Sequence, residues 1–404
     1  RDNHIKQQQQ LTTHNQYLSV YLISHNYTMS SNDQEREIVE DTPHYRSVMI
    51  AGPLSAPPMP RSFASVRPFK TAPQSLKHEK PIISGAAVWS VADLPSLPAA
   101  YFLERSSVYV EGDAQEIANR ICDCLRKQSI AASCDGDDKN LLVAETCDCV
   151  KFAVRLFADQ GKIVVEVQRK CGCSFQFRET ARAVLRSAAK GDTTEAPKRK
   201  FTMPSCIPRD TLEQQQQRAE SGLEVALQQL CSDRLDSQLI GMESLEQVTR
   251  CESRGHVSKK VLEGSCLEKV LSAAQADSTD ARCDIEEQHI SVMKRRAITV
   301  LANALCAISK LNELEVFLEG CAQLKSESFI CNLVETLREA STQPHEATQA
   351  ARCMQHLMAS KDVQSVLIEM SAISVVSDAC TTGASRSTLL EQESKKLKMQ
   401  LSSV

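Results

Sequence analysis

The chain has 404 residues, a formal net charge of −4 and an aromatic content of only 4%. This length allows two or three domains, and the nearly balanced charge provides no global field that would favour nucleic acid. The seventeen scattered cysteines are typical of reduced thiols in an intracellular protein and exclude the disulfide framework of a small secreted domain. No apolar run approaches the ~18 residues that a transmembrane helix needs, so we expect a cytoplasmic or nuclear protein that is neither secreted nor membrane-spanning.

Residues 1–105 are predicted to be a mostly disordered N-terminal arm. They contain a glutamine tract, an acidic stretch and a proline-rich segment from Pro53 to Arg61, and this composition cannot bury enough apolar area to offset chain entropy. The proline-rich segment fits either a stiff linker or a ligand of an SH3-type domain. The part from Ile82 to Leu103 is more apolar, and we expect it to dock on a folded domain. Because the first methionine is Met29, one hypothesis is that residues 1–28 are leader sequence outside the native protein.

Residues 107–190 are predicted to form a small α+β domain, in which two helices flank an antiparallel sheet of about four strands. Apolar residues at helical spacing from Ala114 to Leu125, after an N-cap at Asp113, predict the first helix. A polar turn follows, and the apolar period then changes to two, which predicts strands. The expected strands are Val150–Phe157, Ile163–Val167 and Cys173–Phe177. The closing helix is expected to place Ala181, Val184, Leu185 and Ala188 on its apolar face.

Several local details of this unit are similar to the kinase-associated-1 domain. The match rests on QEIANRICDCLRKQSI as the first helix and on VKFAVRLFADQGKIVVEVQRKCGCSFQFRETARAVL as the central strands and last helix. Gly172 and the run Phe175–Glu179 stand where that family has a glycine and the turn into its final helix. The resemblance implies an accessory domain that binds acidic membrane surfaces or regulates a neighbouring domain. The chain has no Gly-rich loop, His-Arg-Asp or Asp-Phe-Gly motif of a kinase.

A basic linker is expected at residues 191–210, and residues 211–404 are predicted to form an all-α helical-repeat domain. A short phrase at Val261–Leu271 is echoed at Leu367–Val376 and begins again at Phe317. Self-similarity at offsets of roughly 50 residues is typical of an α-solenoid, in which each unit buries its apolar face against its neighbours.

The repeated phrases resemble the armadillo repeat over residues 211–390. On this resemblance Arg295–Ser309 looks like the second helix of a unit, and the two full copies of the phrase look like third helices. The unit length varies, so HEAT-type helix pairs remain the alternative. Either type implies a surface that binds a protein or peptide.

No constellation in the sequence predicts catalysis, because no nucleophile with its base, no P-loop and no Gly-x-Ser-x-Gly elbow is present. Three Cys-x-Cys pairs come closest to a metal site: Cys122/Cys124, Cys147/Cys149 and Cys171/Cys173. Structural zinc usually takes Cys-x2-Cys knuckles, and no histidine lies between His78 and His256 to complete a mixed site. We therefore interpret these cysteines as core residues, with zinc as the alternative, and expect no enzyme activity, cofactor or metal.

Basic residues concentrate in the second half of the small domain and in the linker that follows it. The candidates for binding an anionic lipid or a partner are Lys151, Arg155, Arg178, Arg182, Arg186, Lys198, Arg199 and Lys200. The functional interpretation is attraction to anionic lipid, at about 1 kcal/mol per basic residue near the surface. The other interpretation is a solvated face with scattered ion pairs.

Four polar residues of the helical repeats are candidates for contacting a partner: Arg295, Arg296, Asn303 and Asn332. We predict a non-enzymatic adaptor or scaffold, in which an armadillo-like solenoid binds a protein and the small α+β domain regulates it. The alternative is a peripheral membrane sensor that binds anionic lipid through a basic face of the small domain. Nucleic acid is not an expected partner, and the oligomeric state stays open.

Overall fold

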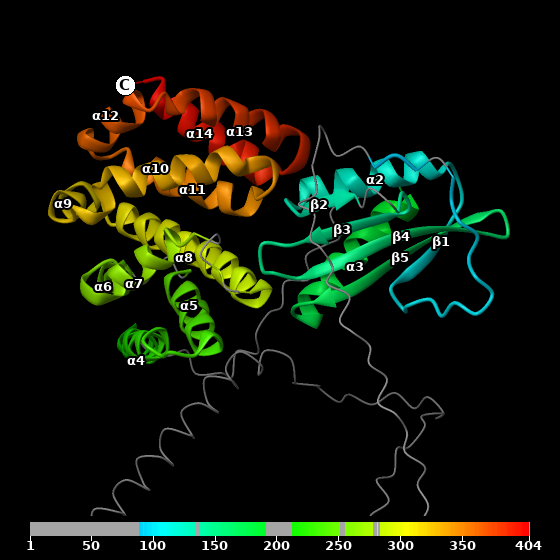
Figure 1. Ribbon diagram of the computed structural model, residues 1–404, viewed down its shortest axis with the longest axis horizontal. Helices are drawn as coiled ribbons and strands as arrows, with labels where there is room; N and C mark the ends of the chain where they lie inside the picture. Colours follow the sequence, from blue (N-terminus) through cyan, green and yellow to red (C-terminus); the bar gives the residue numbers. More distant parts are fainter. Residues whose placement is uncertain are drawn as a thin grey trace, which may run out of the picture. The chain divides into compact units, whose positions relative to one another are not determined.

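The computed structural model describes residues 89–403 except for 92, 135–137, 191–211, 251–254, 278–280 and 282. The predicted arm up to residue 88 and the basic linker, with Lys198, Arg199 and Lys200, lie outside the described residues. The described residues belong to one compact unit, Leu76–Val404, which contains a small α+β region followed by a helical region (Figure 1).

The α+β region has seven elements in the order strand, helix, four strands, helix. They are β1 (Ser107–Val110), α2 (Ala114–Lys127), β2 (Ala131–Cys134), β3 (Leu141–Glu145), β4 (Lys151–Asp159), β5 (Lys162–Cys171) and α3 (Ser174–Lys190). The strands form one antiparallel five-stranded sheet in the order β1-β5-β4-β3-β2. Asp113 begins α2 as predicted, because its carboxylate accepts a hydrogen bond from Glu116 N at 3.0 Å.

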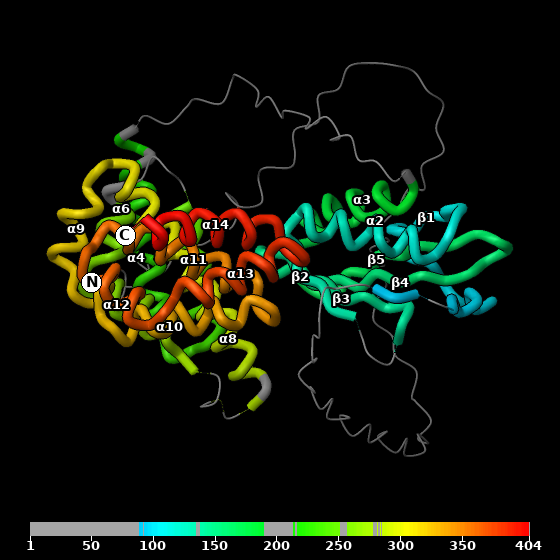
Figure 2. Tube along the Cα trace, turned by 90° about the horizontal axis from the view of Figure 1, so that it is seen from above, coloured from blue at the N-terminus to red at the C-terminus, as the bar shows by residue number. Residues whose placement is uncertain are grey.

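Helices α2 and α3 cover one face of this sheet (Figure 2). Ile117, Ile121 and Val184 of the helices pack with Phe152 and Val154 of β4, and all five side chains are fully buried. Burying a side chain of this size contributes about 1.5–3 kcal/mol, so the helix-on-sheet contact supplies the main hydrophobic stabilisation of this region. The strands β4 and β5, which the alternating pattern predicted, are therefore confirmed, and their alternate apolar residues face α2 and α3.

The opposite face of the sheet is covered by the chain before β1. Ser96 forms a parallel bridge with Ala158, and the rings of Tyr101 and Phe157 lie 5.2 Å apart. Tyr101 donates a hydrogen bond to the buried Glu166 at 2.6 Å, and burial together with this bond raises the pKa of the tyrosine. The expectation that Ile82–Leu103 docks on a folded domain is confirmed for its described residues.

Two details of the predicted sheet are wrong. The run Cys173–Phe177 is not a strand, because α3 begins at Ser174 and the side chain of Phe175 is 56% exposed. Gly172 ends β5 with φ +93°, a left-handed conformation that a strand cannot continue. The sheet also has five strands and not about four, since β1, β2 and β3 accompany β4 and β5 and none of these three was among the expected runs.

The described helical region contains eleven α-helices and two short 3-10 turns. The helices are α4 (Leu212–Leu230), α5 (Leu235–Thr249), α6 (Gly255–Val261), α7 (Gly264–Ala274), α8 (Asp284–Lys310), α9 (Leu314–Gly320), α10 (Glu327–Arg338), α11 (Pro344–Leu357), α12 (Lys361–Glu369), α13 (Ala372–Arg386) and α14 (Thr388–Leu401). From α6 onward they follow a rule of three, in which a short helix precedes two others. The last helices of successive groups pack in a row, α5 against α8, α8 against α11 and α11 against α14 (Figure 1).

The repeated phrase marks corners between helices. Val261–Leu271 spans the end of α6 and most of α7, and Leu367–Val376 spans the end of α12 and the start of α13. Gly264 and Ser371 adopt left-handed conformations at these corners, with φ of +54° and +52°. The prediction that each phrase is a single third helix is therefore wrong. Arg295–Ser309 lies within α8, which is the third helix of its group and not the second.

The corner between α12 and α13 bends the chain by 81°. Among the described residues, no single helix has both the length and the apolar character to cross a membrane, although this bent pair meets both criteria when taken together.

Candidate partner-binding interface

The turn between β3 and β4 contacts the helical region through Glu145, Asp148 and Cys149. Thr146 shapes it, because its N–H donates to Val150 O at 3.1 Å and its hydroxyl accepts from Val150 N at 3.2 Å. Cys149 adopts φ +60° within the turn. This compact geometry directs Glu145 and Asp148 toward helices α5, α8 and α11.

Arg295 of α8 is the centre of this contact. Its guanidinium donates to Glu145 of β3 at 2.7 Å and to Glu346 of α11 at 2.8 Å. The Arg295 side chain is 12% exposed and that of Glu346 only 3%. Burial opposes the charge on Arg295, but Glu346 and Glu145 outweigh that effect and raise the pKa of the guanidinium. The two carboxylates and the arginine therefore form a charged cluster, in which loss of any one side chain leaves a charge without its partner.

His345 lies beside this cluster on α11. Its Nε2 is 3.0 Å from Glu145 O, and the side chain is buried. Burial, and the nearby charge of Arg295, lower the pKa of this histidine. A neutral imidazole therefore holds the end of β3 against α11.

A second ion network extends the contact toward α5. Asp148 pairs with Arg250 at 3.2 Å, and Arg250 also binds Glu246. Glu246 in turn accepts a hydrogen bond from Arg296 at 2.7 Å, and Arg296 binds Glu243 as well. We call the two networks together the junction: Glu145, Asp148, Glu243, Glu246, Arg250, Arg295, Arg296, His345 and Glu346.

A separate contact joins the end of α2 to the start of α14. The Thr388 hydroxyl lies 3.2 Å from Lys127 O and 3.3 Å from Arg126 O, and donates to these carbonyls at the end of α2. Leu389 N donates to the Ser129 hydroxyl at 2.9 Å. Each helix end thus satisfies backbone groups of the other, and the small region is held at both α11 and α14.

Of the four residues predicted to contact a partner, two form ion pairs in the junction and two are partly exposed on helices. Arg295 and Arg296 are committed to the junction and are not available on a free surface. Asn303 lies on α8 and Asn332 on α10, and both are partly exposed. Sequence reasoning missed Glu145 as a partner of Arg295, because the two residues are 150 positions apart in the chain.

The predicted basic residues do not form one surface. Arg178, Arg182 and Arg186 line the exposed face of α3, and among the described residues none of them has an ion-pair partner. Lys151 and Arg155 lie on the opposite face of the sheet, where Lys151 is 3.6 Å from Glu145 and Arg155 donates to Tyr101. The single basic face that the spacing suggested is therefore split in two.

The cysteines of the Cys-x-Cys pairs differ in burial. Cys124 is buried, but Cys147, Cys171 and Cys173 are exposed, so the prediction that these three are core residues is wrong. In the part of the chain that the structure describes, no group of three or more His, Cys, Asp or Glu side chains is arranged to hold a metal ion. Burial raises the pKa of Cys149 and of Cys122, the latter to about 11, which keeps both thiols protonated at neutral pH.

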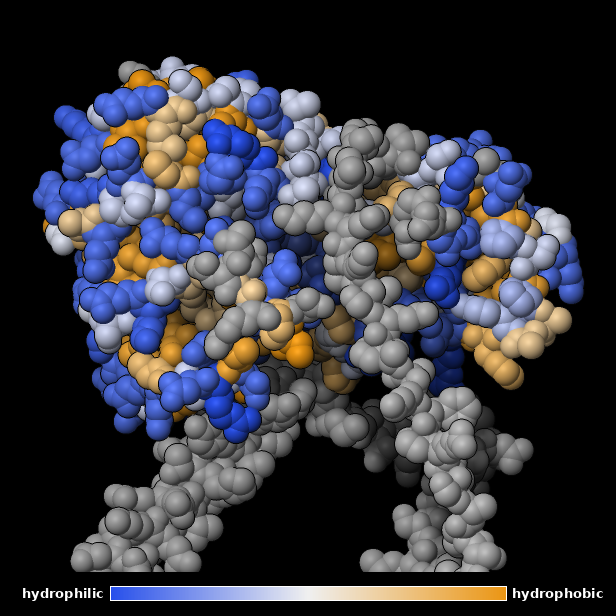
Figure 3. Space-filling model, in the orientation of Figure 1, coloured by the Kyte–Doolittle hydropathy of each residue, from blue (hydrophilic) through white to orange (hydrophobic). Residues whose placement is uncertain are grey.

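Apolar side chains are scattered over a mostly hydrophilic surface on the face of the molecule that Figure 3 shows. No family model, curated protein or solved structure matches the chain. The junction, the polar faces of the helix row and the arginine face of α3 are therefore the features from which a function can be inferred.

Proposed function

We propose that the chain is a non-enzymatic adaptor, in which an armadillo-like helical region binds a protein partner and the small α+β domain regulates that binding. The rule of three from α6 onward supports an armadillo-like solenoid, since it places a short helix before two longer ones in each group. The third helices α8, α11 and α14 pack in a row, which α5 extends by one helix, and this row is the surface that such a solenoid presents to its ligands.

A polar stripe along α8 is the observation that carries the proposal. Ile298, Val300 and Leu301 point in different directions around α8 and are all fully buried, so α8 is packed on most of its sides. Arg296 and Asn303 remain partly exposed, and they are two helical turns apart on the same face. The face that binds the small domain at the junction therefore continues beyond it as a half-exposed polar surface.

Helix α11 continues this stripe next to α8. Gln349, Arg352 and His356 follow His345 at helical spacing and are partly exposed. Arg352 donates a hydrogen bond to Gln349 at 2.8 Å, which orders this face. We name the combined surface the ladder face: Thr299, Asn303, Gln349, Arg352 and His356. Half-exposed polar side chains on stacked helices can bind a peptide backbone without an apolar patch that would aggregate.

Site-specific crosslinking tests this proposal. A photoreactive amino acid in place of Asn303 in the full chain is expected to form a discrete adduct with a partner protein in a cell extract. The matched control is the same amino acid in place of Ser365, which is exposed on α12. Charge reversal by Arg352→Glu is expected to remove the Asn303 adduct. The same set of adducts at both positions, insensitive to that substitution, contradicts a ladder-face site.

A second candidate function is binding to an anionic membrane surface, and the arginine face of α3 favours it. Phe175 is 56% exposed and lies on the same stripe as Arg178, Arg182 and Arg186. An exposed aromatic ring beside three cations fits the interface of an anionic bilayer, with about 1 kcal/mol from each arginine.

Sedimentation with phosphatidylserine-containing vesicles tests this second function. Charge reversal of Arg178, Arg182 and Arg186 is expected to abolish binding, and reversal of three exposed cations of the helical region is the matched control: Lys269, Arg338 and Lys361. Equal binding to neutral phosphatidylcholine vesicles, or binding that high salt leaves unchanged, contradicts the electrostatic mechanism.

A further inference from the structure

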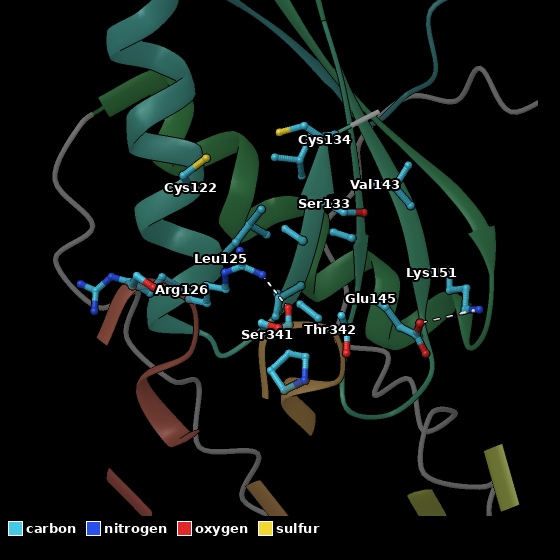
Figure 4. A pocket seen from close by; sticks show the side chains of 18 residues that line it. Cys122, Leu125, Arg126, Ser133, Cys134, Val143, Glu145, Lys151, Ser341 and Thr342 are labelled. Carbon is cyan, nitrogen blue, oxygen red and sulfur yellow. Dashed lines mark hydrogen bonds and ion pairs between the residues drawn. The ribbon is translucent and has the colours of Figure 1, made fainter. Parts of the chain in front are cut away.

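A pocket of about 250 Å³ lies beside the edge strand β2 (Figure 4). One wall consists of α2, the floor consists of β2 and β3, and the opposite wall comes from the helical region. In Figure 4 Cys122 and Cys134 lie at one end of the pocket, and Ser341 and Thr342 lie at the other. The ladder face does not contribute to this pocket, although Glu145 of the junction borders it.

Strand β2 has an open edge along this pocket. It is the last strand of the sheet and pairs only with β3, through the register Ala131↔Glu145 to Cys134↔Leu142. Every second residue of such an edge strand directs its N–H and C=O away from the sheet. Among the described residues, no other backbone hydrogen bond reaches Ala131–Cys134.

The edge also lacks most of the features by which proteins prevent unwanted strand pairing. Of these features β2 has only shortness, with four residues: its sequence Ala-Ala-Ser-Cys contains neither a lysine nor a proline, and its pairing with β3 has no bulge. Its small side chains leave room for another strand about 4.8 Å away. The edge is therefore suited to backbone pairing with an extended segment.

The charges around the pocket define the chemistry of such a segment. Its lining contains three cationic side chains and one anionic side chain: Arg126, Lys151, Arg386 and Glu145. The guanidinium of Arg386 donates a hydrogen bond to Ser341 O in the opposite wall. Glu145 is already bound by Arg295 at 2.7 Å and lies 3.6 Å from Lys151. Arg126 pairs with Asp123 at 4.0 Å, and the Asp123 side chain is 68% exposed, so the pair is weak. The pocket therefore has an excess of positive charge.

We propose that this pocket binds an extended peptide segment of a partner protein, which pairs with β2 as a sixth strand and places an acidic side chain beside Arg126. Main-chain hydrogen bonds provide the affinity in this mode, and the charged anchor provides the specificity. The volume fits a short stretch of single chain, whereas the edge of a second folded sheet would require the helical wall to move away. This site is independent of the ladder face.

Selection of random heptapeptides displayed on phage against the full chain provides the probes. The enriched peptides are expected to be rich in β-branched residues and to carry Asp or Glu. Their affinity is then measured by fluorescence anisotropy with synthetic copies. Thr342→Trp, which fills the pocket from an exposed position, is expected to abolish binding, and Arg126→Glu is expected to weaken it about tenfold.

Two variants serve as matched controls for these substitutions. Ser365→Trp adds the same ring at an exposed position outside the pocket, and Lys127→Glu reverses the charge next to Arg126. Both are expected to bind the peptides as the unchanged protein does. Absence of enrichment, peptides without acidic residues, or equal binding by all four variants overturns the proposal. The Asn303 adduct is expected to persist in Thr342→Trp, because this substitution fills the β2 pocket and leaves the ladder face unchanged. The crosslink at the ladder face therefore tests that surface separately from peptide binding in the pocket.

Discussion

Replacing Arg295 by methionine is expected to destabilise the protein by about 3 kcal/mol. The substitution removes the hydrogen bonds to Glu145 at 2.7 Å and to Glu346 at 2.8 Å. Removing one member of a buried ion pair costs about 3–5 kcal/mol, because it leaves the other charge buried without a partner. Glu145 retains Lys151 at 3.6 Å, so only Glu346 is fully stranded, and the lower end of that range applies.

Urea unfolding followed by circular dichroism measures this loss as a lower midpoint at unchanged slope. The control is Arg338→Met, because its pair with Glu335 has side chains that are 58% and 59% exposed and should contribute less than about 1 kcal/mol. The double variant Arg295→Met with Glu346→Gln removes the stranded charge and is expected to recover more than half of the loss. A cost no larger than that of the control, or strict additivity in the double variant, would show that Glu346 is not stranded as a buried charge.

Three further predictions concern stability and the contacts between the two regions. Gly172→Ala is expected to destabilise the protein by at least about 1–3 kcal/mol, since φ is +93° and a Cβ would lie 2.7 Å from Val150 Cα. Gly320→Ala, in helix α9, meets no atom within 4 Å and should unfold at the same or a slightly higher urea concentration. Burial lowers the pKa of His356 to about 4, so the unfolded chain takes up the proton first, and stability should fall as the pH decreases from about 6.5 to 4. His356→Gln should reduce that slope without removing it, because burial also lowers the pKa of His345, and an unchanged slope would contradict the role of His356. Thr388→Val should lower the free energy of unfolding by about 1 kcal/mol and speed hydrogen exchange at the end of α2. Exchange that stays slow there would count against the α2–α14 contact.

The sequence predicted the elements whose apolar period is long and regular. Helix α2 and strands β4 and β5 show ten or more residues of one period or a clear alternation, and these elements are confirmed. The run Cys173–Phe177 failed because five residues are too few to separate a period of two from the first turn of a helix. The corners at Gly264 and Ser371 were missed since apolar residues continue on both sides of a single left-handed residue.

The candidate site was predictable only in part, for a different physical reason. Basic and polar residues of α8 could be found from their spacing, and they do lie on one face of that helix. The partners of these side chains within the chain could not be predicted, because Arg295 binds Glu145 across 150 positions and His345 contacts the same residue across 200. Such pairs depend on how the two regions dock, and a single sequence contains no periodic signal for that arrangement.

Hydrogen exchange of the full chain, with and without the partner captured at position 303, measures whether that partner covers the ladder face. We expect slower exchange in the segments of α8 and α11 that carry Asn303 and Arg352, with little change in α3. Protection confined to α3 or to strand β2, with the ladder face unaffected, would contradict binding at the ladder face.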